Sequence, residues 1–136
     1  MTKKERIENM TKIMTEDEMV VINNTIELMK TMEEGIDYVN KKFNELKVEE
    51  TINMLIDLTE AFTTIEGAVS PLIVKFEENE IESKNEELKS ALEILLKDLE
   101  QTNGKKAIDI MKLHLIPKFD AWKEEMTRVL KPYIVS

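Results

Sequence analysis

Residue types able to do chemistry are concentrated in one stretch, KLHLIPKFDAW, at residues 112–122. It contains the only histidine, His114, and the only tryptophan, Trp122, with Pro117 between them. A histidine can titrate near neutral pH or bind a metal, but a metal site needs further ligands at fixed spacings. The positions three and four residues from His114 hold two apolar residues, a proline and a lysine. We therefore interpret His114 as an ordinary helix histidine, and we predict neither a metal nor a cofactor.

The carboxylates are numerous but show no catalytic arrangement. Glu33, Glu34 and Asp37 lie within one helical turn, as do Asp57 and Glu60. Two carboxylates act as general acid and base only where a pocket separates their pKa values. By helical phase these acids point outward, so we predict a solvated face and no catalytic residue. The sequence also lacks Gly-rich phosphate loops, the G-x-S-x-G motif and calcium-loop spacing.

Composition narrows the class of protein further. The 136 residues contain no cysteine, which excludes disulfides and thiolate metal sites. The net charge of −9 would repel a phosphate backbone, so we predict no nucleic-acid ligand. No apolar run approaches the ~18 residues of a membrane span, and no secretory signal is visible. We therefore predict a cytoplasmic protein that does not bind membranes.

Heptad spacing predicts a first long helix that begins after Thr15 and ends near Lys47. Thr15 and Glu18 form a capping box, in which each side chain binds the other residue's backbone N–H. Apolar residues then recur every seven positions in two rows, as in the seam of a helical bundle. The rows are Ile22, Met29, Ile36 and Phe43, and Thr25, Met32, Val39 and Leu46.

A new apolar stripe predicts a second helix, whose inner face contains Ile52, Leu55 and Phe62. This helix reaches Ser70 and Pro71. Proline lacks an N–H and crowds the carbonyl four residues earlier, so the helix would kink there. Alternatively, Ser70 caps a fresh helix with Pro71 in its first position.

Two further helices follow. Ser83 and Glu86 form a second capping box, which predicts the start of the third helix. Asn103 and Gly104 end that helix, because glycine accepts the left-handed conformation of a C-terminal cap. The fourth helix runs from about residue 105 to 133, with a bend at Pro117. Its predicted seam, which includes an aromatic core pair, is Ile108, Met111, Leu115, Phe119, Trp122, Met126, Val129 and Tyr133.

Four helices with short connections predict an all-α fold, an antiparallel four-helix bundle with long helices. We assign residues 15–136 to the bundle domain. Residues 1–14 form a short N-terminal amphipathic segment in this prediction. It carries four basic and two acidic side chains.

The second and fourth helices also carry an apolar stripe away from their predicted seams. A simple bundle buries one face of each helix, so a second stripe needs another cover. The N-terminal segment could supply it through Ile7, Met10, Ile13 and Met14. That strip is short for two stripes, so we favour a second chain, either another copy or a client helix. The predicted partner-binding residues are Met54, Leu58, Ile65, Leu72, Ile110 and Leu113.

The last third of the chain contains the segment LKDLEQTNGKKAIDIMKLHLIPKFDAWKEEM. Near its end, four residues form a pattern: Leu115, Pro117, Phe119 and Trp122. This pattern resembles that of an uncharacterised group of small acidic all-helical proteins from low-GC Gram-positive bacteria. His114 departs from the acidic residue of that pattern, and Lys118 departs from an apolar one. TINMLIDLTEAFTTIEGAV extends the resemblance. It implies a helical fold and no known activity.

These observations lead us to expect a non-catalytic helical interaction module, an adaptor or chaperone-like protein that self-associates or binds a client helix. It resembles flagellar and secretion export chaperones in being small, acidic and helical, and this analogy concerns the fold alone. The alternative is a metal- or carboxylate-dependent enzyme with a site in the bundle core, which requires acids that point inward. A third reading is an acidic mimic of nucleic acid, which requires carboxylates in rows at phosphate-like spacing.

Overall fold

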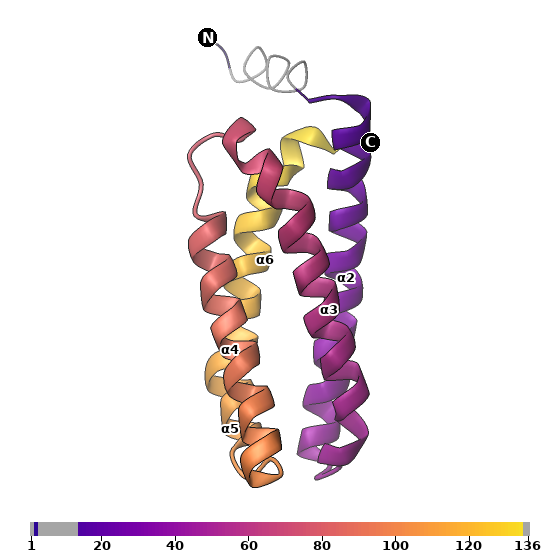
Figure 1. The fold of residues 1–136 in the computed structure, drawn as a ribbon, viewed down its shortest axis with the longest axis vertical. Helices are drawn as coiled ribbons and strands as arrows, with labels where there is room; N and C mark the ends of the chain where they lie inside the picture. The colour runs from indigo at the N-terminus through magenta and orange to yellow at the C-terminus, as the bar shows by residue number, and fades with distance from the viewer. Residues whose placement is uncertain (1, 3–13, 135–136) are drawn as a thin grey trace.

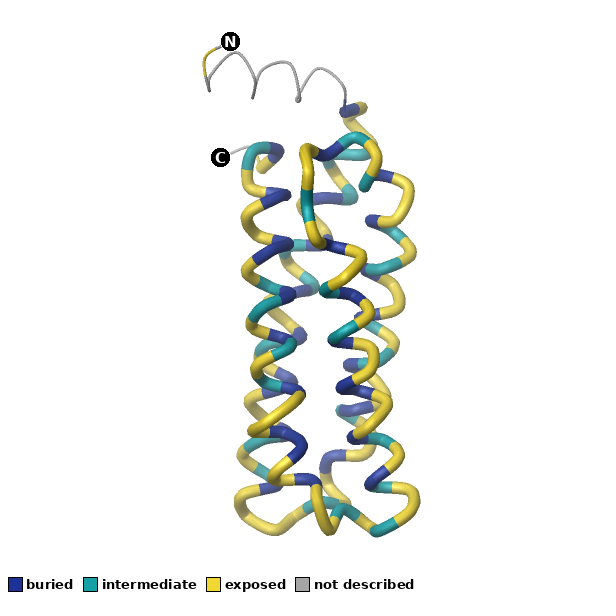
Figure 2. Tube along the Cα trace, turned by 90° about the vertical axis from the view of Figure 1, so that its left-hand side faces the viewer, coloured by how far each residue is buried: buried dark blue, intermediate teal, exposed yellow. Residues whose placement is uncertain are grey.

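A computed structural model describes residues 2 and 14–134. The chain forms four long helical columns that run alternately up and down, and no strand occurs in the described part (Figure 1). Buried residues follow the inward side of each column, and exposed ones follow the outside (Figure 2). The predicted all-α antiparallel four-helix bundle is confirmed. Of the predicted N-terminal segment, all residues except Thr2 and Met14 lie outside the described residues.

The first column is α2 (Glu16–Asn44). Both hydrogen bonds of the predicted capping box are present, from Glu18 N to Thr15 Oγ1 and from Thr15 N to Glu18 Oε1. The helix ends as predicted before Lys47. Leu46, however, adopts a left-handed φ of 60° and is 80% exposed. It belongs to the turn and not to the seam, so the second heptad row ends at Val39.

The second column contains η1 (Val48–Thr51), α3 (Ile52–Val69) and the 3-10 helix η2 (Ser70–Lys75). The chain continues through Pro71 in a tighter helix. Ser70 keeps helical dihedral angles and caps nothing with its side chain. Of the two predictions for this region, the fresh helix capped by Ser70 is therefore wrong.

The third column, α4 (Ile81–Thr102), begins earlier than predicted. The proposed capping box of Ser83 and Glu86 is wrong, because both residues lie inside the helix. The predicted end is confirmed: Asn103 has a φ of 58° and Gly104 a φ of 86°. A Cβ on Gly104 would lie 2.8 Å from Val48 Cγ1, so a side chain is also sterically excluded there.

The fourth column is continuous but changes its winding. Its parts are α5 (Ala107–Ile110), the π-helical turn η3 (Met111–Leu115), α6 (Ile116–Leu130) and the 3-10 turn η4 (Lys131–Tyr133). The π turn ends two residues before Pro117, whose ring crowds the carbonyl four residues earlier, within that turn. The wider turn shifts the helical phase, so Ile110 faces the core and Ile108 is 38% exposed. Placing Ile108 in the seam was therefore wrong.

The predicted second stripe is largely core. Leu58, Ile65, Leu72 and Ile110 are all less than 8% exposed within this single chain. Ile52, predicted on the inner face, is 47% exposed instead. On α3 the buried arc is centred between the two predicted stripes, and on the fourth column the π turn rotates Ile110 inward. The prediction that these four residues contact a partner is therefore corrected.

The groove between α3 and α4

Buried polar contacts join α4 to α6. The indole Nε1 of Trp122 donates to Asn85 Oδ1 at 2.8 Å, and both residues are less than 7% exposed. Phe119 and Phe62 pack against the same indole, each with its ring centroid 5.8 Å away. The predicted core position of Phe119 and Trp122 is confirmed. Trp122 thus fixes the side chain of an α4 residue as well as filling the core.

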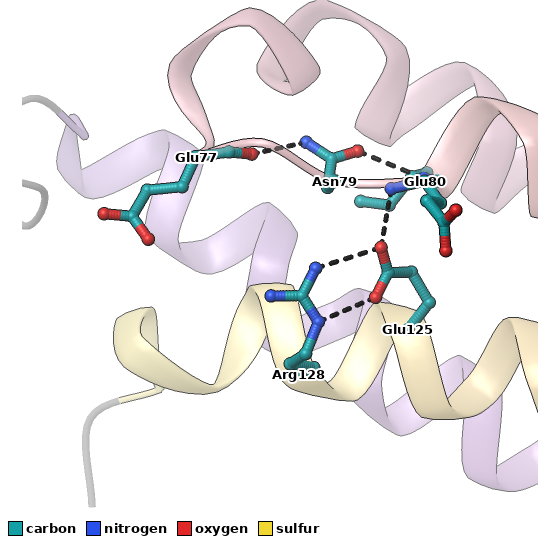
Figure 3. Close-up of polar contacts among 6 residues, drawn as sticks. Glu77, Asn79, Glu80, Glu125 and Arg128 are labelled. Carbon is teal, nitrogen blue, oxygen red and sulfur yellow. Dashed lines mark hydrogen bonds and ion pairs between the residues drawn. The ribbon is translucent and has the colours of Figure 1, made fainter.

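A second contact anchors the start of α4. Glu125 of α6 accepts the backbone N–H of Glu80, at 2.6 Å to Oε2 (Figure 3). Arg128 holds the same carboxylate with two nitrogens, at 2.7 and 3.0 Å. Asn79 bridges the turn by donating to the Glu77 carbonyl and accepting from Ile81 N. The carboxylate therefore satisfies the N–H of Glu80, the residue before α4, while the Asn79 side chain caps the first N–H of the helix itself.

The environment of Glu125 stabilises its charged form. The Arg128 guanidinium, and then the Glu80 N–H, hold the pKa of this carboxyl below its usual value, while burial opposes them. The same pair raises the pKa of Arg128. Glu125 has a saturated set of partners, which is typical of a structural cap and not of an acid–base catalyst.

α2 is also tied to its neighbours. Gly35 lets α3 approach closely, since a Cβ there would lie 2.9 Å from Leu58 Cδ2. Glu18 pairs with Lys75 at 2.7 Å, and this ammonium group lowers the pKa of Glu18. Glu33 of α2 pairs with Lys123 of α6. Each of these contacts links α2 either to the second column or to the fourth.

The pair α3 and α4 is different. Within the described part of the chain, no hydrogen bond or ion pair joins these two helices. An open hollow of about 650 Å³ lies between the C-terminal half of α3 and the first turns of α4, and it reaches η2. Its lining residues are Thr63, Glu66, Gly67, Ser70, Ile73, Glu82, Ser83, Asn85 and Glu86. A smaller hollow of about 160 Å³ continues it and shares Thr63 and Glu66. Together they form what we call the α3–α4 groove.

The groove has an apolar floor and an acidic rim. Phe62, Leu92 and the half-buried Leu96 line its narrow part, and the first two are less than 4% exposed. The wide part is bordered by Glu66, Glu82 and Glu86; no described residue forms an ion pair with them. Lys89 and Glu93, in the narrow part, balance each other's charge. The net charge of the groove is therefore negative.

Asn85 supplies a hydrogen-bond donor at the base of the groove. An indole N–H can only donate, so the contact with Trp122 orients the amide with its oxygen toward α6. The amide nitrogen has no hydrogen-bond partner among the described residues. Asn85 is 6% exposed and lines the wide hollow. A carbonyl oxygen entering the groove could accept a hydrogen bond from this amide nitrogen.

The predicted partner-binding residues do not form one surface. Leu113 is 63% exposed and Met54 is half-buried, on different columns, while the other four residues are core. His114 is exposed in a shallow hollow between α4 and the fourth column, beside Ile94 and Lys118. Over the described residues, no group of three or more His, Asp or Glu side chains is placed to hold a metal.

Sequence reasoning missed the α3–α4 groove. One signal was available: small residues recur on one side of α3 at Thr59, Thr63, Gly67 and Ser70. Small side chains there leave space beside α4, and a Cβ added to Gly67 would meet nothing within 4 Å. Two of the three rim acids lie in residues 82–86, where we had predicted the capping box of the third helix.

Residues 20–125 match the family model described as Domain of unknown function (DUF8042). The chain belongs to this family. The DUF8042 match begins within α2 and ends at Glu125, so it contains both walls of the α3–α4 groove and the α6 contacts behind α4. No curated protein and no solved structure matches the chain. None of the helices in the described part of the chain combines the length and the hydropathy that a membrane span requires.

Proposed function

We propose that this DUF8042 protein is a non-catalytic interaction module that holds an amphipathic helix of a partner protein in the α3–α4 groove. The supporting observation is the groove itself, which is open, apolar at its floor and acidic at its rim. An amphipathic helix can place its apolar face on the half-buried Ile73 and Leu96 and basic side chains near the rim. Exposed charges of opposite sign would steer and orient such a partner.

The proposed binding site, the α3–α4 groove, differs from the apolar stripes that the sequence suggested. The stripes of α3 and of the fourth column are unavailable because most of their residues are buried. The groove lies instead on the side of α3 that faces α4. The net charge of −9 disfavours a second copy of the chain as the partner, since two acidic surfaces would repel each other.

The test uses two synthetic amphipathic peptides, one of Leu and Lys and one of Leu and Glu. We expect the Lys peptide to bind and to shift the NMR amide signals of the groove residues. The Glu peptide should not bind. Changing Glu66 and Glu86 together to Lys should weaken binding at least tenfold, about 1.4 kcal/mol.

A matched control separates the groove from general charge attraction. Asp120 and Glu124 are exposed on α6, and no described residue pairs with them. Changing both to Lys alters the net charge by the same amount on the opposite side of α4. Equal weakening by the two double variants, or signal shifts spread over the whole surface, would contradict the proposal.

A further inference from the structure

We infer that Asn85 selects the direction in which a partner helix binds, because its amide nitrogen donates to a free carbonyl oxygen in the last turn of that helix. The partner's C-terminal end then lies in the wide hollow beside η2, and its N-terminal end lies toward the start of α3. The inference rests on the proposed function, since it assigns an orientation to the helix that the α3–α4 groove binds.

The two ends of the α3–α4 groove differ in polarity. Apart from Gly67 and Ile73, every residue that lines the wide hollow is polar or acidic. The narrow hollow contains Phe62, Leu92 and Leu96 instead. A helix that lies along the groove therefore meets polar groups at one of its ends and apolar side chains at the other.

The apolar end extends along α3 beyond the narrow hollow. Ile52 and Ile56 are 47% and 46% exposed. They precede Thr59 by seven and three residues, so they lie on the same side of the helix as this residue, which lines the narrow hollow. From Ile52 to Ser70 this side of α3 measures about 27 Å, the length of a partner helix of about 18 residues.

Asn85 presents an unpartnered donor at the polar end. Its side-chain oxygen accepts from the Trp122 indole at 2.8 Å, and no described residue accepts from its amide nitrogen. The side chain is 6% exposed, so packing and the indole together fix its position. Among the described residues, the one fully buried side-chain nitrogen or oxygen without a partner is Tyr133 Oη, so the amide nitrogen of Asn85 is accessible to a ligand. A ligand at the base of the wide hollow therefore needs a hydrogen-bond acceptor.

The last turn of an α-helix offers such acceptors. Inside a helix each carbonyl oxygen accepts the N–H four residues later, but the last four carbonyls have no partner within the helix. Basic side chains are favoured in the same turn, because they offset the negative end of the helix dipole. In the wide hollow these side chains would meet Glu66, Glu82 and Glu86. The C-terminal end of a partner helix thus complements both the donor and the acids.

The opposite direction fits the base of the wide hollow poorly. The first turn of a helix presents free N–H groups, which cannot accept a hydrogen bond from the Asn85 amide. The positive end of the helix dipole would be attracted to the rim acids, but Glu82 and Glu86 are exposed, and water and salt weaken such attractions. The buried amide therefore decides the direction.

The first experiment determines the direction of binding. It uses the Leu–Lys peptide with Lys along its whole length and both ends blocked, so that the placement of charge favours neither direction. A spin label at the C-terminal end of the peptide should broaden the amide signals of Glu82 and Glu86 in the ¹⁵N-labelled protein. A label at the N-terminal end should broaden those of Ile52 and Ile56. The reverse pattern, or equal broadening of both sets by each label, would overturn the inference and leave the proposed function standing.

The second experiment isolates the donor. Asn85→Asp keeps an oxygen for the Trp122 indole but replaces the amide nitrogen by a carboxylate oxygen, so that two acceptors would face each other. The added negative charge by itself would strengthen binding of a basic peptide. Loss of the hydrogen bond should instead weaken it about fivefold and remove the preference for one direction.

Ser90→Asp is the matched control. Ser90 is exposed on α4 and lies outside the α3–α4 groove, so this variant gains the same charge and keeps the donor. Binding by Asn85→Asp as tight as that by Ser90→Asp would overturn the inference. The indole N–H signal of Trp122 reports whether the Asp variant keeps its fold, and if it does not, the direction experiment on the wild type decides. Failure of the wild type to bind the peptide would contradict the proposed function and this inference together.

Discussion

The two sides of α4 illustrate opposite ways of packing one helix. Toward α6, Asn85 meets the Trp122 indole and Glu80 meets the Glu125 carboxylate. Toward α3, no polar contact exists among the described residues, and an open hollow of about 650 Å³ remains. Both sides belong to one rigid helix, so the polar contacts of α4 with α6 also fix the position of the side that borders the groove. A groove held in this way is preformed, which would lower the entropy cost of the binding that we propose.

The largest effect is expected on the closed side. Trp122→Ala should lower the free energy of unfolding by about 3–5 kcal/mol, because it empties a buried aromatic position. It also leaves Asn85 Oδ1 without its donor. Urea denaturation measures the change. A loss below 1 kcal/mol would mean that this contact does not hold α4.

Glu125→Gln should cost less, about 1.5–3 kcal/mol, the range for a hydrogen bond to a charged group. Because the pKa of Glu125 is lowered in the folded protein, its contribution is complete above the ordinary value of 4.5 and is lost as the pH falls through the folded-state value. The difference between wild type and variant should therefore be largest near neutral pH and shrink below about pH 4.5. A difference that grew with acidification would show that the carboxylate is not stabilised in its charged form.

Alanine substitutions at the two helical glycines should change the free energy of unfolding by smaller amounts and in opposite directions. Gly67→Ala, on the open side, should raise the free energy of unfolding by about 0.5–1 kcal/mol, because alanine favours a helix and nothing lies within 4 Å. Gly35→Ala should instead lower it by about 1 kcal/mol, since the new Cβ would crowd Leu58 in the core. Thermal or urea unfolding of both variants tests the pair. Equal effects would mean that α3 packs no more tightly on α2 than on the α4 side.

The smallest effect is expected at the groove rim. The double change of Glu66 and Glu86 to Lys should alter the free energy of unfolding by no more than about 0.5 kcal/mol, as is usual for surface positions without specific contacts. Urea denaturation checks this. A larger loss would indicate that the rim acids stabilise the fold, and it would weaken the use of this variant as a binding probe.

Local patterns in the sequence predicted much of the fold. The capping box at Thr15, the left-handed cap at Asn103 and the core position of Trp122 all depend on neighbouring residues or on a long heptad pattern. The predicted start of α4 failed, because the N–H of Ile81 is accepted by Asn79 and the N–H of Glu80 by Glu125, 45 residues away. A local pattern could have indicated the contact of Asn79 but not that of Glu125.

The candidate site was missed for a related reason. Helical phase was counted at a constant 100° per residue, but the π turn at Met111–Leu115 changes the phase within one column. On α3, the buried arc depends on how close α2 and α4 approach, and Gly35 allows close approach only on the α2 side. The stripe that suggested a partner was therefore core.

The sequence by itself determined four amphipathic helices, most of their ends and an acidic surface, because propensity, capping and periodicity act over a few residues. The tertiary structure decided which helix sides meet, since that depends on side chains from separate columns fitting at one place. It brought Glu125 and Trp122 to one side of α4 and left Glu66, Glu82 and Glu86 around a hollow on the other. Bundle packing is cooperative across the whole cross-section, so the groove exists only when all four columns are in place.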